Sequence, residues 1–213
     1  MLTQAVRALT AGMDTPQGTL TATTAPGRFP EEQRLTVYLT ADDAAARLLT
    51  VTVYHGWKWY APWAELTPVS DSITLGARHL TYHGSRIETR LISLFADAIQ
   101  PPAHLFISYQ TDHETARALA HGVPAPATRL GYMLFTRGFT WYKDWYHPEG
   151  WMEGNQKLQA EKPLDMQHEQ RHHRAIKRDI TTYLAADTTN TDIARTARQR
   201  ASHILEHLQG HTR

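Results

Sequence analysis

The sequence predicts a mixed domain of the α/β or α+β class, in which helices flank a central sheet and a helical extension follows at the C-terminal end. Residues 34–40 and 48–63 are rich in β-branched residues that alternate with polar ones, as half-buried strands do. Residues 85–100 place apolar side chains at helical spacing, and residues 104–110 form a short apolar run typical of a strand inside a sheet. A strand, a helix and a strand in this order indicate at least one parallel pair with a crossover helix.

The composition of this 213-residue chain is that of one folded domain, alone or with an appendage. A formal charge of +1 argues against a nucleic-acid or membrane-surface partner. The absence of cysteine excludes disulfides, thiolate metal sites and a cysteine nucleophile. No apolar run approaches the roughly 20 residues that a membrane span needs, so we expect a cytoplasmic protein without a membrane partner.

Before the predicted helix at 85–100, the sequence predicts a short N-terminal helix followed by strands and turns. Apolar residues at helical spacing between 2 and 9 indicate a short amphipathic helix packed on the domain. A stretch rich in Gly, Thr and Pro, at 15–30, then leads to the first strand. The next elements are, in order, a turn or short helical link at 41–48, two strands within 48–63 that bend at His55–Gly56, and a strand at 73–84 that breaks or bulges near Gly76.

The helix at 85–100 carries the strongest local signals. Ser85 is its expected N-cap, Glu88 is the other half of a capping box, and two prolines at 101–102 end it. Two more helices follow at 112–122 and 127–138, each ended by a glycine.

Residues 139–163 are rich in tryptophan and tyrosine and predict a hairpin that completes the sheet. We expect Phe139, Trp141 and Trp145 to form the inward row of its first strand, with a return strand at 157–161. The composition then becomes polar, and two helices joined at 187–191 are expected. The predicted organisation is a domain at 1–163 and a helical extension at 164–213.

The junction at 82–86 is a candidate ligand site because a strand leads into a helix there. Free backbone N–H groups at a helix N-terminus favour a phosphate, Gly84 would let the backbone approach it, and Arg86 adds a cation. The alternative interpretation is an ordinary turn with a good cap, since a single glycine is a weak signal.

Histidines concentrate at His168, His172 and His173, where an i, i+4 pair on a helix could hold a metal ion. Arg171 and Arg174 stand beside them, and their positive charges oppose a bound cation. We therefore predict a solvated helix face and no metal site.

The tryptophans form two groups, one at 57–63 and one at 141–151. Pairing of two aromatic strands within the core is the favoured interpretation, because such rings bury large areas. The functional alternative is a cleft with aromatic walls and a polar rim. A third alternative is stacking on nucleic-acid bases, which the small net charge disfavours.

Two stretches resemble the GCN5-related N-acetyltransferase (GNAT) fold. Residues 105–150 resemble its C-terminal half, in which a strand leads to a helix ending in Gly-Phe, here Gly138–Phe139, before a strand pair closes the sheet. Residues 82–95 resemble the strand, loop and helix that hold the pyrophosphate of coenzyme A. More closely, residues 122–163 resemble a prokaryotic protein family of unknown function that is regarded as GNAT-like and rich in the pattern GY…GF.W.KDWY.PEG…EG.QK.Q.EKP.

The resemblance implies transfer of an acyl group from acetyl-CoA or another acyl-CoA to an amine on a small molecule or peptide. It implies that the cofactor lies across splayed strands that end at His83 and at 107–108. The pyrophosphate would then be held by Gly84, Ser85 and Arg86.

The chain departs from the GNAT pattern at positions that matter for catalysis. Leu134 stands where a tyrosine often protonates the thiolate, and no acidic residue occupies 73–83, where such enzymes often place a base. From side-chain chemistry, the candidate catalytic residues are His83, Tyr142 and Asp144, and the candidate substrate-binding residues are Trp141, Trp145, Glu149 and Glu153.

Two other hypotheses remain open at this stage. One is a non-catalytic ligand-binding or protein-interaction module on the same fold, with a homodimer formed through the C-terminal helices. The other is an RNA-associated role, which predicts binding that weakens steeply with salt.

Overall fold

The structure is a computed structural model that describes residues 2–56, 61–70, 72–108, 112–145, 157–186 and 192–210, with the backbone alone for 144 and 145. The helices are α1 (Thr3–Thr10), α2 (Arg86–Ala98), α3 (His113–Ala120), the 3₁₀ turn η1 (Ala125–Ala127), α4 (Arg129–Phe135), α5 (Met166–Ala185) and α6 (Asp192–Gly210). The strands are β1 (Met13–Thr15), β2 (Gly18–Pro26), β3 (Glu32–Ala41), β4 (Ala44–Tyr54), β5 (Trp63–Pro68), β6 (Ser72–Leu75), β7 (Arg78–Thr81), β8 (His104–Ser108), β9 (Trp141–Trp145) and β10 (Lys157–Glu161).

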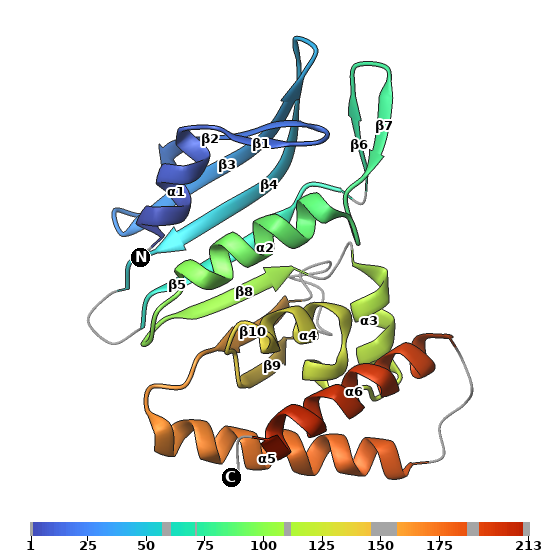
Figure 1. The fold of residues 1–213 in the computed structure, drawn as a ribbon. Coiled ribbons are helices and arrows are strands. Elements are labelled where there is room, and N and C mark those ends of the chain that lie inside the picture. The colour runs from blue at the N-terminus through green and yellow to red at the C-terminus, as the bar shows by residue number, and fades with distance from the viewer. Residues whose placement is uncertain are drawn as a thin grey trace.

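The main sheet has eight strands among the described residues, in the order β1-β2-β3-β4-β5-β8-β10-β9 (Figure 1). Neighbouring strands run antiparallel except β5 and β8, which are parallel and aligned from Trp63–His104 to Leu66–Ile107. The chain passes from β5 to β8 through the β6–β7 hairpin and α2. The predicted mixed α/β class and the predicted parallel pair with a crossover helix are confirmed.

One face of this sheet is apolar and lies under helices. Figure 1 shows α1 and α2 lying in front of the sheet, and α4 beside them over β10. The buried side chains on this side include Leu9 of α1, Leu91 and Phe95 of α2, Leu66 of β5 and Ile107 of β8. Burial of such side chains supplies the main driving force for folding and fixes which face of each strand points inward.

The N-terminal part contains one strand that was not predicted from the sequence and one turn that was. The Gly/Thr/Pro-rich stretch forms the long strand β2, where Gly18 adopts φ +145° and approaches the backbone of Thr40 too closely for any side chain. The expected turn or helical link at 41–48 is a tight hairpin turn at Asp42 and Asp43, both with positive φ, as short two-residue hairpin loops require.

The strand expected at 73–84 is a separate hairpin. Strands β6 and β7 pair only with each other within the described chain, and the turn between them contains Gly76 at φ +59°. The strand that lies parallel to β8 in the main sheet is therefore β5, which ends at Pro68. The expectation that a strand ending at His83 lies beside β8 is wrong, because the turn at Gly76 removes that segment from the main sheet.

Strands β9 and β10 close the sheet, and the return strand at 157–161 is confirmed. The predicted inward row is wrong in part: Phe139 is buried, but Trp141 is half-buried on one face and Tyr142 points to the core on the other. The reason is that Phe139 and Thr140 precede β9, so strand alternation starts at Trp141 and does not continue from Phe139.

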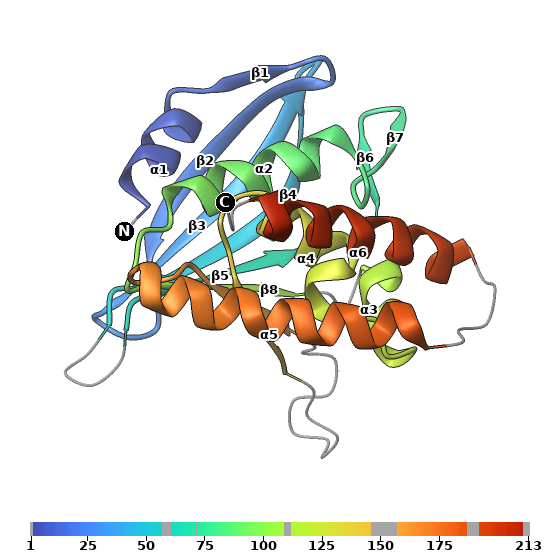
Figure 2. The ribbon, with the colours of Figure 1, turned by 60° about the horizontal axis from the view of Figure 1, so that its bottom comes forward.

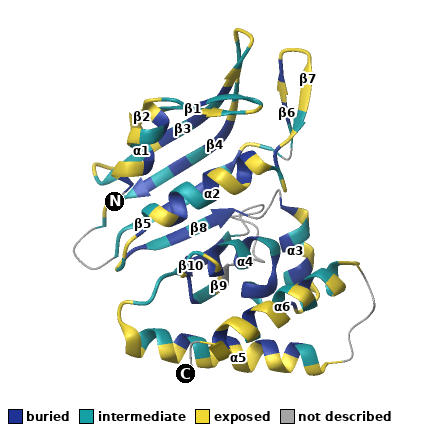
Figure 3. Cartoon of the chain, viewed as in Figure 1, coloured by how far each residue is buried: buried dark blue, intermediate teal, exposed yellow. Residues whose placement is uncertain are grey.

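Helices α5 and α6 pack side by side beyond the β9 end of the sheet (Figure 2). Their apolar stripes join residues of α3, η1 and α4 in a second core: Ala118, Val123, Ala127, Phe135, Ile176, Ile180, Tyr183, Ala197, Ala201, Ile204 and Leu208. Their outer surfaces are exposed (Figure 3). The two predicted tail helices are confirmed, and the division of the chain near 163 stays a prediction.

No helix in the described ranges is long and apolar enough to cross a membrane.

Candidate functional site

Four ionisable side chains meet near the carboxyl ends of β5 and β8, where Figure 1 shows α2 beginning and α3 following β8. His83 precedes α2, Glu88 lies in its first turn, Asp112 caps α3 and Arg129 begins α4. We call these four residues the α2 cluster. Glu88 is 1% exposed and Asp112 2%, so the cluster lies inside the protein.

Glu88 is the centre of the cluster. Its two carboxylate oxygens accept hydrogen bonds from Arg129 Nη1 at 2.6 Å and Nη2 at 3.0 Å. The same carboxylate lies 2.9 Å from His83 Nδ1 and accepts the Gly84 N–H at 2.7 Å. Arg129 Nη2 also lies 2.9 Å from Asp112 Oδ2. A buried carboxylate with this many donors meets the requirement that buried charges be paired and hydrogen-bonded.

The electrostatics hold Glu88 and Arg129 ionised. Burial alone would raise the pKa of Glu88, but the hydrogen bonds from His83 and Arg129 outweigh burial and lower it. For Arg129, burial works to lower the pKa, and the two carboxylates raise it overall. Glu88 is therefore a carboxylate at neutral pH, and it orients the His83 imidazole through Nδ1 in the way that carboxylates orient catalytic histidines.

The Tyr82 ring packs against the His83 imidazole. The two rings meet edge to face at 5.3 Å, and the Tyr82 hydroxyl is buried without a hydrogen-bond partner among the described residues. Burial and then the Glu88 charge raise the pKa of this hydroxyl, so it stays protonated. Tyr82 is a second proton-bearing group beside the cluster, which the sequence did not single out.

The residues predicted to hold the pyrophosphate form the start of α2. Ser85 is the N-cap and its Oγ accepts the Glu88 N–H at 3.2 Å, as predicted, but the Glu88 carboxylate bonds to Gly84 N and not to Ser85 N. Gly84 adopts φ +74°, and a Cβ placed on it would meet nothing within 4 Å. Arg86 is exposed. Its own N–H and that of Ile87 lie in the first helical turn, which has no intrahelical acceptors for them.

Of the predicted hairpin residues, Trp141 and Tyr142 have described side chains, and neither belongs to the α2 cluster. The Tyr142 hydroxyl donates to the carbonyl oxygens of Gly131 at 3.2 Å and Phe139 at 2.8 Å, and burial raises its pKa well above 10. These bonds give Tyr142 a role in holding α4 on the sheet. Trp141 lines a cavity beside α5. The side chains of Asp144 and Trp145, and all of Glu149 and Glu153, lie outside the described residues, so their predicted roles stay predictions.

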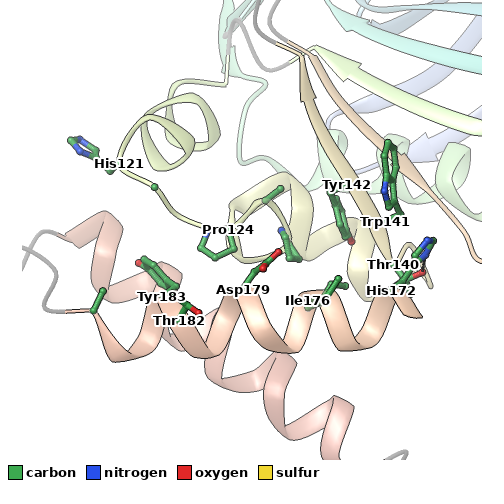
Figure 4. A pocket seen from close by; sticks show the side chains of 15 residues that line it. His121, Pro124, Thr140, Trp141, Tyr142, His172, Ile176, Asp179, Thr182 and Tyr183 are labelled. Atoms are coloured by element: carbon green, nitrogen blue, oxygen red, sulfur yellow. Dashed lines mark hydrogen bonds between the residues drawn. The ribbon is translucent and has the colours of Figure 1, made fainter. Parts of the chain in front are cut away.

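The cavity lies between α5, the segment 121–126 and the start of β9, and has a volume of about 690 Å³. Figure 4 shows Tyr183 and Thr182 at one end of it, and His172 with Thr140 at the other. Its polar and aromatic lining is His121, Thr140, Trp141, Tyr142, His172, Asp179, Thr182 and Tyr183.

A second group of ionisable side chains adjoins this cavity. Glu161 at the end of β10 and His168 and His172 in α5 each offer a ligand atom, and these three atoms lie within 4.8 Å of one another. We call these residues the His–Glu triplet. His172 is 9% exposed, and burial together with His168, Arg171 and His173 lowers its pKa to about 4, so it is neutral at neutral pH.

The expectation of a solvated helix face is wrong for His172, because its side chain is buried and its Nδ1 lies 3.0 Å from the Thr140 hydroxyl. It holds for Arg171 and Arg174, which are exposed. The local signal for the pair is the spacing His-Glu-Gln-Arg-His at 168–172, an HExxH pattern on a helix. The α2 cluster had no comparable signal, since Glu88 and Arg129 are 41 residues apart.

Comparisons with known proteins give a family and a fold. Residues 17–187 match the family described as "Protein of unknown function (DUF1122)". The chain also resembles the crystal structure of a protein of unknown function from Aquifex aeolicus VF5, with 28% identity and a TM-score of 0.76 over 96% of this chain and 98% of that one. No curated protein matches the sequence.

Proposed function

The chain belongs to the DUF1122 family of proteins of unknown function, and from this starting point we propose that it is a GNAT-like enzyme that transfers an acyl group from acyl-coenzyme A to an amine. One observation carries the proposal: β5 and β8 form the parallel pair of the described main sheet, α2 crosses between them, and the antiparallel pair β10–β9 closes the sheet after α4. The order of parallel pair, crossover helix and closing strand pair agrees with the resemblance of 82–95 and 105–150 to the GNAT fold, with β5 in the place of the strand that was expected to end at His83.

The location of the α2 cluster supports the proposal. In open sheets with parallel strands, ligands bind outside the carboxyl ends of those strands. The start of α2 and the segment after β8 both lie at that end of the β5–β8 pair (Figure 1). His83, Gly84 and Arg86 are therefore close to the position where a ligand is expected.

The residues at the start of α2 fit a phosphate-bearing cofactor. The N–H groups of Arg86 and Ile87 lie at the N-terminus of α2, which is the positive end of the helix dipole. The Arg86 side chain is exposed. The open space at Gly84 leaves room for a ligand next to the backbone. The Gly84 N–H itself is bonded to Glu88, so Arg86 and Ile87 are the proposed pyrophosphate ligands. When bound, acyl-coenzyme A would supply the acyl group as an activated thioester, and coenzyme A would leave as the free thiol.

His83 is the proposed general base. An ammonium acceptor must lose a proton before it can act as a nucleophile, and a positioned imidazole suits that task. Glu88 binds Nδ1 and so directs proton exchange to Nε2. The negative charge of Glu88 also stabilises the imidazolium that forms. Tyr142 is a poor candidate for the acid, since its hydroxyl already serves two backbone carbonyls.

A second candidate function is a non-catalytic ligand-binding module. It is favoured by two hydrogen bonds within the chain: the Gly84 N–H donates to the Glu88 carboxylate, and the Glu88 N–H donates to Ser85 Oγ. A purely structural helix start would have the same bonds. A homodimer through the C-terminal helices stays a prediction, and Ile176, Ile180 and Ile204 would not form its interface because they are buried in the second core.

Isothermal titration of the full-length protein with acetyl-coenzyme A tests the proposal. We expect saturable binding that Arg86→Ala weakens and Arg90→Ala, an exposed arginine one turn further along α2, leaves unchanged. Release of the coenzyme A thiol in the presence of a panel of amines then reports transfer. Binding without thiol release for any amine would favour the module. No heat and no thermal shift at millimolar acetyl-coenzyme A would overturn the cofactor assignment.

A further inference from the structure

We propose that Glu161, His168 and His172 bind one divalent metal ion of the zinc type, at the junction of β10 and α5. Their ligand atoms lie within 4.8 Å of one another, close enough to converge on a single ion by side-chain rotation. Two imidazoles and one carboxylate are a common ligand set for Zn²⁺ in proteins. This site is separate from the α2 cluster and does not depend on acyl transfer.

Two of the three proposed ligands are already oriented by partners. Thr140 Oγ1 lies 3.0 Å from His172 Nδ1, so an Nδ1–H donated to this hydroxyl leaves the Nε2 lone pair as the metal ligand. His104 Nδ1 lies 3.0 Å from Glu161 Oε2, so an Nδ1–H donated by His104 would hold this carboxylate. Metal-binding histidines and carboxylates generally have such outer partners, which fix the ring and the carboxylate in place.

His168 and His172 share one face of α5 because they are four residues apart, and their rings lie 4.2 Å apart. The His168 Nδ1 accepts the Leu164 N–H at 3.3 Å, a long hydrogen bond. Binding a metal through Nε2 would give up this bond, since Nδ1 would then carry the proton. Glu169, the second residue of the HExxH pattern, lies 3.8 Å from His173 and is not one of the three proposed ligands.

The neighbouring cations do not prevent metal binding. Arg171 and Arg174 are exposed on α5, where water and salt screen their charges. The third ligand, Glu161, brings a negative charge from β10 on the inner side of the helix, which the sequence alone did not place there.

A three-ligand site leaves a coordination position for water or another ligand. His172 and Thr140 also line the cavity beside α5 (Figure 4), so a small molecule in that cavity would lie next to the ion. On this proposal the cavity is a site for a metal-binding small molecule, such as a carboxylate or hydroxamate.

The test is zinc uptake by the full-length protein after treatment with a chelator, measured by equilibrium dialysis and metal analysis. We expect about one Zn²⁺ per chain, the stoichiometry of a single mononuclear site, together with a rise in melting temperature. His168→Gln and Glu161→Gln should each weaken binding at least about tenfold. His173→Gln, which removes the adjacent histidine of the same helix, should leave binding unchanged.

Substitution with Co²⁺ gives a second measurement that does not depend on folding stability. A visible spectrum of tetrahedral Co²⁺ in the wild type and His173→Gln, but not in His168→Gln or Glu161→Gln, would support the site. Zinc uptake that is absent from the wild type, or equal in the wild type and both ligand variants, would overturn the proposal. If one ligand variant is unfolded by circular dichroism, the other decides the outcome.

Discussion

The guanidinium of Arg129 binds both oxygens of the Glu88 carboxylate, at 2.6 and 3.0 Å, and so ties the start of α4 to the start of α2. Breaking a buried ion pair by removing one partner leaves an unpaired charge in the interior. We therefore expect Arg129→Met to lower the free energy of unfolding by about 3–5 kcal/mol. Urea denaturation measures this loss, with Arg90→Met as the exposed control. A loss similar to that of the control would show that water or another cation replaces Arg129.

The same pair predicts how stability depends on pH. The pKa of Glu88 is lowered in the folded protein from 4.5, its ordinary value. Its contribution to stability is therefore complete at pH values above 4.5 and is lost as the pH falls through the lower folded pKa. The difference in unfolding free energy between wild type and Glu88→Gln should be largest near neutrality and shrink as the pH falls below 4.5. A difference that stays constant down to acid pH would contradict this assignment.

The proposed general base is tested by His83→Gln. We expect kcat for acyl transfer to fall by about 10²- to 10⁴-fold, with unchanged affinity for acetyl-coenzyme A. His79→Gln, in the exposed part of β7, is the matched control and should retain full activity. Loss of cofactor affinity together with kcat in His83→Gln would instead point to a structural role for the imidazole.

Tyr142→Phe separates a catalytic from a structural hydroxyl. Because this hydroxyl bonds the carbonyl oxygens of Gly131 and Phe139, its removal should cost about 1 kcal/mol of stability. Acyl transfer, measured at a temperature where both proteins are folded, should be unchanged. A large fall in kcat without a change in stability would restore Tyr142 as the catalytic acid.

The second core predicts that α5 contributes strongly to stability. Ile180 is fully buried there, so Ile180→Ala should lower the free energy of unfolding by about 2–5 kcal/mol. Leu164→Ala is the control, since Leu164 is 58% exposed and its truncation should have little effect. Equal effects of the two substitutions would mean that the tail helices do not fold together with the rest of the chain.

The parts of the fold that the sequence predicted correctly depend on local signals. Ser85 and Glu88 lie within one helical turn, so the start of α2 could be predicted from neighbouring residues. The strand at 157–161 and the helices of the tail likewise follow from short-range periodicity. The strand β2 was missed because its Gly, Thr and Pro residues resemble a loop, and the backbone approach of Gly18 to Thr40 is a tertiary contact.

The candidate site was predictable only in part. His83, Gly84, Ser85 and Arg86 are contiguous and do lie together at the start of α2. Asp112 at the start of α3 and Arg129 at the start of α4 also belong to the α2 cluster. Their positions depend on how α3 and α4 pack, which local sequence patterns do not show. The face of Trp141 was mispredicted because Phe139 and Thr140 precede β9, so the strand alternation does not extend back to Phe139. The His168–His172 pair did carry a local pattern. Its third proposed ligand, Glu161, lies at the end of β10 and comes close to the pair only through the way β10 leads into α5.

Helix α4 has seven residues, too few to be stable by itself, so its position is set by what it touches. Leu130 and Leu134 belong to the main core, while Phe135 belongs to the core shared with α5 and α6. A loosened tail would thus shift the segment that supplies Arg129, and through it the carboxylate that orients His83. We expect substitutions in α5 or α6 that loosen the second core to change the orientation of His83 without contacting it, a form of long-range coupling built on one short helix.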